Sequence, residues 1–417
     1  MSAFRPSTLV KTSTAVRIFS LSAASLASFL CPFAGNAQVF TEIEGDPYTS
    51  VAGVVSTPGG PAIFGHTIGG DLNPATRWTK STGFVPLNVP ELSPMMFDVE
   101  DVSINGSVVV GRGSGQLEPN RASAYRWSST SGLQELTSNI RDGTFTVLSR
   151  VSDNGSVVAG FGATSGFRWQ AETGAVSIGA KLNDVDVIGP DNQLFFANDL
   201  SADGSVIVGM NTLSPFQLGE AARWTSADGP VGLGFLFNNG EVEFSTATGV
   251  SADGSIVVGT ASIDSESNQL SEAFRWTKET GLVPLDDPAN GGSTFASAIS
   301  RDGSLIVGGV GFFPSDSEPF VWTPGSGMQL LVDLLTDQYG IGDEIAGWNL
   351  GRITALSRDG RYIVGQGTHG DNQRRDWLVD LGANFTPIPE PGTYGLMGAI
   401  GLLVAVVARR RRAARTA

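Results

Sequence analysis

Short runs of alternating apolar and polar residues recur along most of the chain. Residues 246–250 and 255–260 are two such runs, and Asp253-Gly254 lies between them. Asp-Gly between alternating runs favours a tight β-hairpin, because both central turn positions tolerate a positive φ. Two further runs follow at 273–277 and 281–285, so this repeat is predicted to contain four short strands.

The hairpin unit recurs with a nearly constant period. Its turn glycines are separated by 49, 49, 50, 49 and 57 residues, and a divergent copy at 56–65 precedes them. These glycines are Gly106, Gly155, Gly204, Gly254, Gly303 and Gly360. Seven four-stranded repeats of about 49 residues predict an all-β fold, a seven-bladed β-propeller over residues 38–386. A β-solenoid is the main alternative, although its coils are usually shorter.

A second motif, Arg-Trp, follows each of the earlier hairpins. Alternation places Phe274 and Trp276 on one face of their strand, and we expect such aromatic pairs to pack between successive sheets. The arginines would then lie between blades, each paired with an acid such as the hairpin Asp of a neighbour, because an unpaired buried guanidinium is costly. A ring for ligand recognition is the alternative. The five arginines in phase are Arg77, Arg126, Arg168, Arg223 and Arg275.

The last repeat has no clear fourth strand before residue 387. Residues 39–43, Val-Phe-Thr-Glu-Ile, precede the first repeat and have the pattern of a single strand. We predict that this strand completes the last blade and closes the ring, which leaves no exposed sheet edge at the junction.

The N-terminal segment has the features of a secretory signal peptide helix at residues 1–37. It contains no acid, carries Arg5, Lys11 and Arg17, and continues into an apolar stretch at 18–33. Small residues before Ala37 predict cleavage between Ala37 and Gln38. The single cysteine, Cys31, lies inside this segment, so the exported body is predicted to have no disulfide.

The C-terminal segment, 387–417, combines three features in order. Pro389-Glu390-Pro391 comes first, an uncharged run at 394–408 follows, and an arginine cluster ends the chain. The cluster comprises Arg409, Arg410, Arg411 and Arg412. The segment resembles the PEP-CTERM sorting signal of Gram-negative bacteria. That resemblance implies processing by an exosortase and hosts that make exopolysaccharide and biofilm.

The residues of this tail also predict a hydrophobic helix that anchors the protein in the membrane, transiently or stably. Its apolar run has 15 residues, fewer than the ~20 typical of a transmembrane helix. The arginines would remain in the cytoplasm, which leaves the body outside.

The body between the two segments is strongly acidic. It contains 18 Lys and Arg against 40 Asp and Glu, a net charge of −22. Such a charge argues against nucleic acid as a partner. The recurring hairpin acids are expected to form turns, with calcium binding as the alternative and no other cofactor predicted. They are Asp203, Asp253, Asp302 and Asp359.

Candidate catalytic side chains are few. His66 and His369 are the only histidines, so a histidine triad or zinc site is not predicted, and no catalytic residue is assigned. Acid pairs for glycoside cleavage remain open among Asp184, Asp186, Asp191, Asp286 and Asp287. The long segments 179–193 and 331–348 are the best places for a binding surface.

The repeats resemble the HAF family of bacterial extracellular repeats, in the hairpin motif and in Ala273-Phe274-Arg275-Trp276. That family implies no enzymatic activity. We therefore expect an exported, non-enzymatic component of the cell envelope or extracellular matrix that binds exopolysaccharide or surface proteins. A secreted polysaccharide hydrolase or lyase on the same scaffold is the alternative, and a purely structural component is a third.

Overall fold

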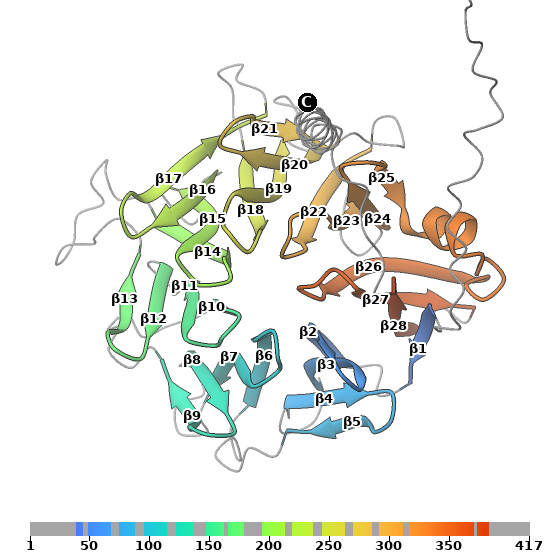
Figure 1. Cartoon of the computed structure of the whole chain (residues 1–417), viewed down its shortest axis with the longest axis horizontal. Helices are drawn as coiled ribbons and strands as arrows, with labels where there is room; N and C mark the ends of the chain where they lie inside the picture. Colours follow the sequence, from blue (N-terminus) through green and yellow to red (C-terminus); the bar gives the residue numbers. More distant parts are fainter. Residues whose placement is uncertain are drawn as a thin grey trace, which may run out of the picture. The chain divides into compact units, whose positions relative to one another are not determined.

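The computed structural model describes residues 39–44, 49–67, 75–87, 96–114, 122–136, 147–161, 166–178, 194–212, 219–236, 244–262, 270–285, 292–311, 317–370 and 373–382. These residues form seven antiparallel four-stranded sheets, arranged as blades around an axis (Figure 1). The predicted seven-bladed β-propeller is confirmed.

The blades follow one another along the chain. Blade 1 contains β2 (Thr49–Thr57), β3 (Gly60–Thr67), β4 (Ala75–Thr79) and β5 (Gly83–Pro86). Blade 2 contains β6 (Met96–Val102), β7 (Val108–Ser114), β8 (Ala122–Ser128) and β9 (Gly132–Glu135). Blade 3 contains β10 (Val147–Val151), β11 (Val157–Phe161), β12 (Gly166–Gln170) and β13 (Gly174–Ser177). Blade 4 contains β14 (Leu194–Leu200), β15 (Val206–Thr212), β16 (Glu220–Thr225) and β17 (Gly229–Gly234).

The remaining blades have the same order until the last. Blade 5 contains β18 (Ser245–Val250), β19 (Ile256–Ser262), β20 (Ser271–Thr277) and β21 (Gly281–Pro284). Blade 6 contains β22 (Thr294–Ile299), β23 (Ile306–Val310), β24 (Glu318–Thr323) and β25 (Gly327–Leu330). Blade 7 contains β26 (Trp348–Leu356), β27 (Tyr362–His369), β28 (Arg374–Asp380) and β1 (Phe40–Ile43).

The first strand of each repeat lies nearest the axis, as β2, β6, β10, β14, β18, β22 and β26 show in Figure 1. We call the end of the propeller that holds the turns between first and second strands the hairpin face. The opposite end, where the second and fourth strands of the repeats finish, is the loop face.

The N-terminal strand closes the ring as predicted. β1 pairs with β28 in antiparallel register, with Phe40 opposite Val379 and Ile43 opposite Asp376. The Phe40 ring lies 5.2 Å from that of Trp348, and Arg375 donates to Glu42 at 2.6 Å. Blade 7 therefore joins the first and last described strands of the chain.

Apolar side chains fill the spaces between successive blades. Phe274 of blade 5 is fully buried against Val206 and Val208 of blade 4, and Phe320 of blade 6 is buried against Val258 of blade 5. The prediction that aromatic residues of the third strands pack between sheets is confirmed. Each thin sheet thus obtains its core from its neighbours.

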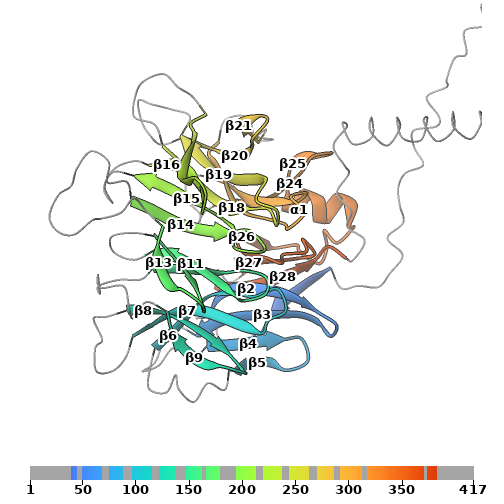
Figure 2. The same ribbon diagram turned by 60° about the vertical axis from the view of Figure 1, so that its left-hand side comes forward.

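Of the two segments predicted to offer a binding surface, residues 331–348 pack partly against the core. Residues 331–348 begin with α1 (Leu331–Asp333) and the π-helical turn η3 (Leu334–Gln338), and α1 packs beside β24 (Figure 2). Leu331, Leu334 and Leu335 are buried in the core of blades 6 and 7. One side of the segment is therefore packed, because apolar residues at helical spacing cover the neighbouring core, while its other side is exposed and its role as a binding surface stays a prediction. The other candidate, 179–193, lies outside the described residues.

The predicted terminal helices, at 1–37 and 394–408, also lie outside the described residues. Within the described part of the chain, no helix is long and apolar enough to cross a membrane.

Candidate functional site

The repeated hairpin is a self-contained hydrogen-bonded turn. Ser201 donates its hydroxyl to Asp203 Oδ1 at 2.8 Å, and the N–H of Ser205 donates to the same oxygen at 2.9 Å. The N–H of Val206 in turn donates to Ser201 Oγ at 3.0 Å. Bonds from the Ser205 backbone and side chain lower the pKa of Asp203. The acid therefore forms the turn, as its position in the motif predicts.

The other hairpins repeat this arrangement with either acid or amide. Asn105 and Asn154 accept the same two bonds in blades 2 and 3. Calcium binding by the hairpin acids stays a prediction. Among the residues described, no three His, Cys, Asp or Glu side chains are grouped to hold a metal ion.

The turn glycine is required for two reasons. Gly204 has a φ of +68°, and a Cβ at this position would lie 2.6 Å from Cβ of Val157 in the preceding blade. A side chain here would strain the backbone and would also push two blades apart.

The arginines of the third strands do lie between blades, but their partner differs from the expected one. The Nε–H groups of Arg126 and Arg168 donate to the carbonyl oxygens of Gly155 and Gly204 in the next blade, at 3.0 and 3.1 Å. Arg223 donates likewise to Gly254 at 3.3 Å. The hydrogen-bond acceptor is thus the glycine carbonyl and not the expected hairpin carboxylate, although Asp203 still interacts electrostatically with Arg168.

At the hairpin face, backbone hydrogen bonds join blades 2 to 7 in succession around the axis. Each bond links the residues that follow the motif serines of two neighbouring blades. The donor and acceptor residues are Ile104 to Asp153 (3.3 Å), Asp153 to Ala202 (3.0 Å), Ala202 to Ala252 (3.0 Å), Ala252 to Arg301 (2.8 Å) and Arg301 to Arg358 (2.8 Å). These bonds hold the hairpin turns of neighbouring blades together around the axis.

Four charged side chains, which we call the ionic lid, cross the channel at this end: Asp101, Asp153, Arg301 and Arg358. Arg358 Nη2 donates to Asp101 Oδ2 at 2.9 Å, and its Nη1 lies 3.7 Å from Asp153 Oδ1. Arg301 donates to the same Asp153 oxygen. Burial and the charge of Arg358 lower the pKa of Arg301 to about 9, so its guanidinium stays charged at neutral pH. The lid joins blades 2 and 3 to blades 6 and 7.

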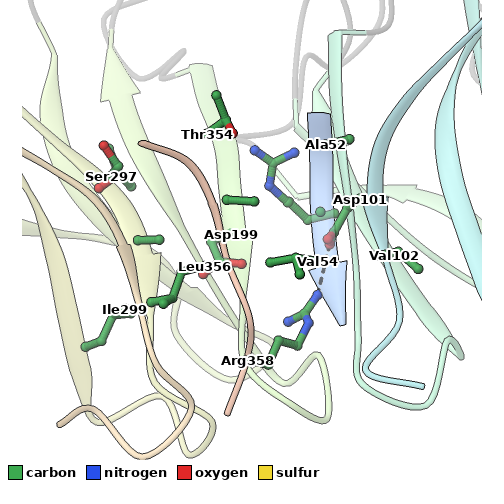
Figure 3. Close-up of a pocket in the computed structure, with 15 residues that line it drawn as sticks. Ala52, Val54, Asp101, Val102, Asp199, Ser297, Ile299, Thr354, Leu356 and Arg358 are labelled. Carbon is green, nitrogen blue, oxygen red and sulfur yellow. Dashed lines mark hydrogen bonds and ion pairs between the residues drawn. The ribbon is translucent and has the colours of Figure 1, made fainter. Parts of the chain in front are cut away.

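An inner cavity of about 150 Å³ adjoins the lid. Figure 3 shows Asp101 of β6, Asp199 of β14 and Arg358 of the turn after β26 directed into it. Asp199 accepts a bond from the N–H of Val250 at 3.0 Å, and burial raises its pKa. Asp101 accepts one from the N–H of Val151 at 2.9 Å. Both carboxylates therefore accept a hydrogen bond from a buried residue of the innermost strand in the next blade.

A second cavity of about 480 Å³, which we call the mouth cavity, continues toward the loop face. It shares Thr248, Ser297 and Thr354 with the inner cavity, and Phe295 and Arg352 line its outer part. The channel is thus blocked by ion pairs at the hairpin face and hollow toward the loop face.

The two histidines lie apart from this channel site. His66 Nε2 is 3.7 Å from Asp98 Oδ1 between blades 1 and 2, and burial lowers the pKa of His66. His369 ends β27, and its ring stacks on Trp348 at 5.0 Å. The acids considered for glycoside cleavage lie outside the described residues. So do the predicted cleavage site Ala37/Gln38, the motif Pro389-Glu390-Pro391 and the arginine cluster 409–412.

The sequence interpretation missed the charged residues of the channel. Asp101, Arg150 and Asp199 occupy the position two residues before the motif serine, where the later repeats have Gly249, Ala298 and Ala355. A charged residue at an otherwise small, inward position was the available signal.

Comparisons with known proteins separate the tail from the body. A family model described as the PEP-CTERM protein-sorting motif matches residues 387–412. Comparison with curated protein sequences finds no match.

Solved structures resemble the fold. The substrate-bound prolyl oligopeptidase B from Galerina marginata has a TM-score of 0.52 at 9% identity, covering 82% of this chain and 50% of that one. Its apo form has a TM-score of 0.50 at 9% identity, with the same coverage. The β-propeller domain of the trilobed protease from Pyrococcus furiosus has a TM-score of 0.48 at 8% identity, covering 83% and 99%.

The chain spans about half the length of the prolyl oligopeptidases that it matches, and at these identities the likeness shows the fold alone. The tail is more specific, because a PEP-CTERM motif is a sorting signal that an exosortase recognises. The chain is therefore an exported, envelope-associated protein that carries a PEP-CTERM sorting motif at residues 387–412, following a seven-bladed β-propeller.

Proposed function

We propose that the propeller is a non-enzymatic binding module of the cell surface, which engages exopolysaccharide through its loop face. The apolar run of the C-terminal segment holds the propeller at the envelope and is the part that an exosortase would remove. The resemblance of the repeats to HAF proteins is part of the same proposal.

One observation carries the non-enzymatic role. The carboxylates around the inner cavity are already committed to structural partners. Asp101 and Asp153 pair with Arg358 and Arg301, and Asp199 accepts a backbone N–H. General acid–base chemistry on a glycoside needs two carboxyl groups that can reach substrate and exchange protons. These groups instead hold blades together.

The loop face supports binding as the role. The mouth cavity opens there, and the connections after the second and fourth strands of the blades start from that end. Loops held at one end of a rigid scaffold are where propellers and barrels usually present recognition residues.

A glycan array with the full chain, purified in mild detergent, tests this function. We expect retention of one class of bacterial polysaccharide with no change in the length of the bound sugar. Product analysis of the same sugars by mass spectrometry provides the second measurement. Cleavage products would overturn the non-enzymatic role, and absence of binding to every glycan would favour a purely structural component.

A further inference from the structure

The mouth cavity has one charged group in its wall, and the surrounding structure leaves that group available. Among the described residues that line the cavity, only Arg352 is charged, and it is exposed. Its Nη2 donates to the neutral amide oxygen of Gln366 at 3.3 Å. No described carboxylate lies within ion-pair distance, although the buried Asp376, bonded to the same Gln366, interacts with Arg352 electrostatically from further away. Arg358, on the same strand-hairpin unit, is instead fully engaged in the ionic lid.

The rest of the wall offers hydroxyl groups and one aromatic residue, Phe295. Thr248 donates its hydroxyl to the carbonyl of Ala296 at 2.8 Å, and Thr354 donates to that of Val364 at 3.2 Å. A hydroxyl that donates to the backbone keeps its lone pairs to accept bonds from a ligand. Ser297 and Phe295 line the same cavity, and the Phe295 ring lies against Gly309 of its own blade.

We infer that the mouth cavity binds an acidic sugar, a uronic acid unit of a polysaccharide chain, with its carboxylate on Arg352. This inference rests on the proposed binding function and specifies its ligand. A planar guanidinium can bind a carboxylate through two parallel hydrogen bonds. The hydroxyl oxygens accept from the sugar O–H groups, and Phe295 covers the C–H face of the ring.

The size and charge of the site agree with such a ligand. A cavity of about 480 Å³ lies in the range of small-molecule sites. The body carries a net charge of −22, but salt screens charges beyond about 8 Å at physiological ionic strength. The positive charge of Arg352 therefore favours a negatively charged ligand in the mouth cavity, despite the net charge of the body. An acidic peptide would satisfy Arg352 equally, but it has fewer O–H donors for the accepting hydroxyls.

Isothermal titration of the full chain tests the inference with three probes of similar size: tetragalacturonate, neutral maltotetraose and tetraglutamate. We expect tetragalacturonate to bind the most tightly, with an affinity that falls as salt is added. Arg352→Gln should weaken that binding about tenfold to a hundredfold, because one charge-assisted bidentate contact is lost. Arg352→Lys keeps the positive charge but cannot make two parallel hydrogen bonds. Its affinity should therefore lie between those of the unsubstituted chain and Arg352→Gln.

Arg374→Gln is the matched control, since Arg374 is an exposed arginine of the same blade that does not line the cavity. Its affinity should equal that of the unsubstituted chain. Near-ultraviolet circular dichroism verifies that each variant is folded, and Arg352→Lys replaces Arg352→Gln if the latter is not.

Three results would overturn the inference. They are equal binding of maltotetraose, tighter binding of tetraglutamate, and unchanged binding of tetragalacturonate by folded Arg352→Gln. If the chain binds only neutral glycans on the array, the proposed binding function survives and the acidic ligand does not. If it binds no glycan, both fail.

Discussion

The two ends of the central channel are built from the same innermost strands but have opposite properties. At the hairpin face, a chain of backbone bonds and the ionic lid close the channel. Toward the loop face, the mouth cavity is lined by hydroxyls and one exposed arginine. The difference depends on a few positions, since the residue after the motif serine is Ala202 or Ala252 in two blades but Arg301 or Arg358 in two others.

The residues that maintain the fold are repeated, whereas the residues that line the channel are not. The motif serine closes the turn of its own blade, and in blades 2, 3 and 4 the third-strand arginine donates to the turn-glycine carbonyl of the next blade. The channel differs from blade to blade, because Asp101 and Asp199 stand where Gly249 and Ala298 stand elsewhere. We therefore expect mutations at the closed end to lower the stability of the fold, and mutations at the open end to weaken binding.

The largest expected effect comes from opening the closed end. Arg358→Ala leaves Asp101 and part of Asp153 without their cation in a partly buried site, and we expect a loss of about 2–4 kcal/mol in the free energy of unfolding. Urea unfolding followed by tryptophan fluorescence measures it.

Arg361→Ala is the control at the same face. Arg361 makes two bonds to Asp380, at 2.8 and 2.9 Å, and lies over the ring of Tyr362, but it is away from the channel and one-third exposed, so its loss should cost about 1 kcal/mol, less than the loss of Arg358. Equal losses for the two variants would show that the lid has no special role in closing the ring.

A smaller effect is expected from the hairpin glycine. Gly204→Ala combines a positive φ with a contact of 2.6 Å to Val157, and we expect a loss of about 2–3 kcal/mol. Gly229 has a similar φ of +69° in an outer turn, but a Cβ there would meet nothing within 4 Å. Gly229→Ala should therefore lose only the backbone strain, about 1 kcal/mol. A thermal-denaturation series on both variants separates contact from strain.

The blades and the clasp could be predicted from the sequence because their determinants are local and repeated. The turn residues Asp253-Gly254 and the alternation around Trp276 determine structure within one repeat. Because the same pattern recurs in other repeats, it could be recognised in the sequence. Phe40 could be assigned to blade 7 because a closed ring lacked one strand.

The channel site could not be predicted in the same way. The partners in the lid are 148 residues apart for Arg301 and Asp153, and 257 for Arg358 and Asp101, so only closure of the ring brings them together. Local pattern also failed for Leu331, Leu334 and Leu335, because helical spacing in a supposed loop predicts burial only when a neighbouring core is known. The partners of Arg126 and Arg168 depended on which turn atom faces the next blade.

A smaller difference in the free energy of unfolding is expected when a hairpin acid is replaced and stability is measured as a function of pH. The pKa of Asp203 is lowered in the folded chain, so its stabilising effect is complete above the unfolded value of about 4 and is lost as the pH falls through the folded value. Asp203→Asn removes this titration and keeps the turn, since Asn105 and Asn154 make the same bonds. The variant should be less stable than the unsubstituted chain at pH 7, because its bonds are not charge-assisted, and should lose less stability below about pH 4, so that the two curves converge. Parallel acid-unfolding curves would contradict the assignment of these bonds.

The smallest effect on stability is expected at the open end. Arg352→Gln removes an exposed charge whose only protein bond among the described residues is the long contact to Gln366, so the free energy of unfolding should change by less than about 0.5 kcal/mol. The same urea experiment that measures Arg358→Ala measures this variant, and the two arginines are six positions apart in one repeat. A stability loss at Arg352 comparable to that at Arg358 would mean that the mouth is held together by its cation. A charge needed for folding is a poor candidate for a ligand anchor, so that result would remove the physical basis for placing recognition at this end.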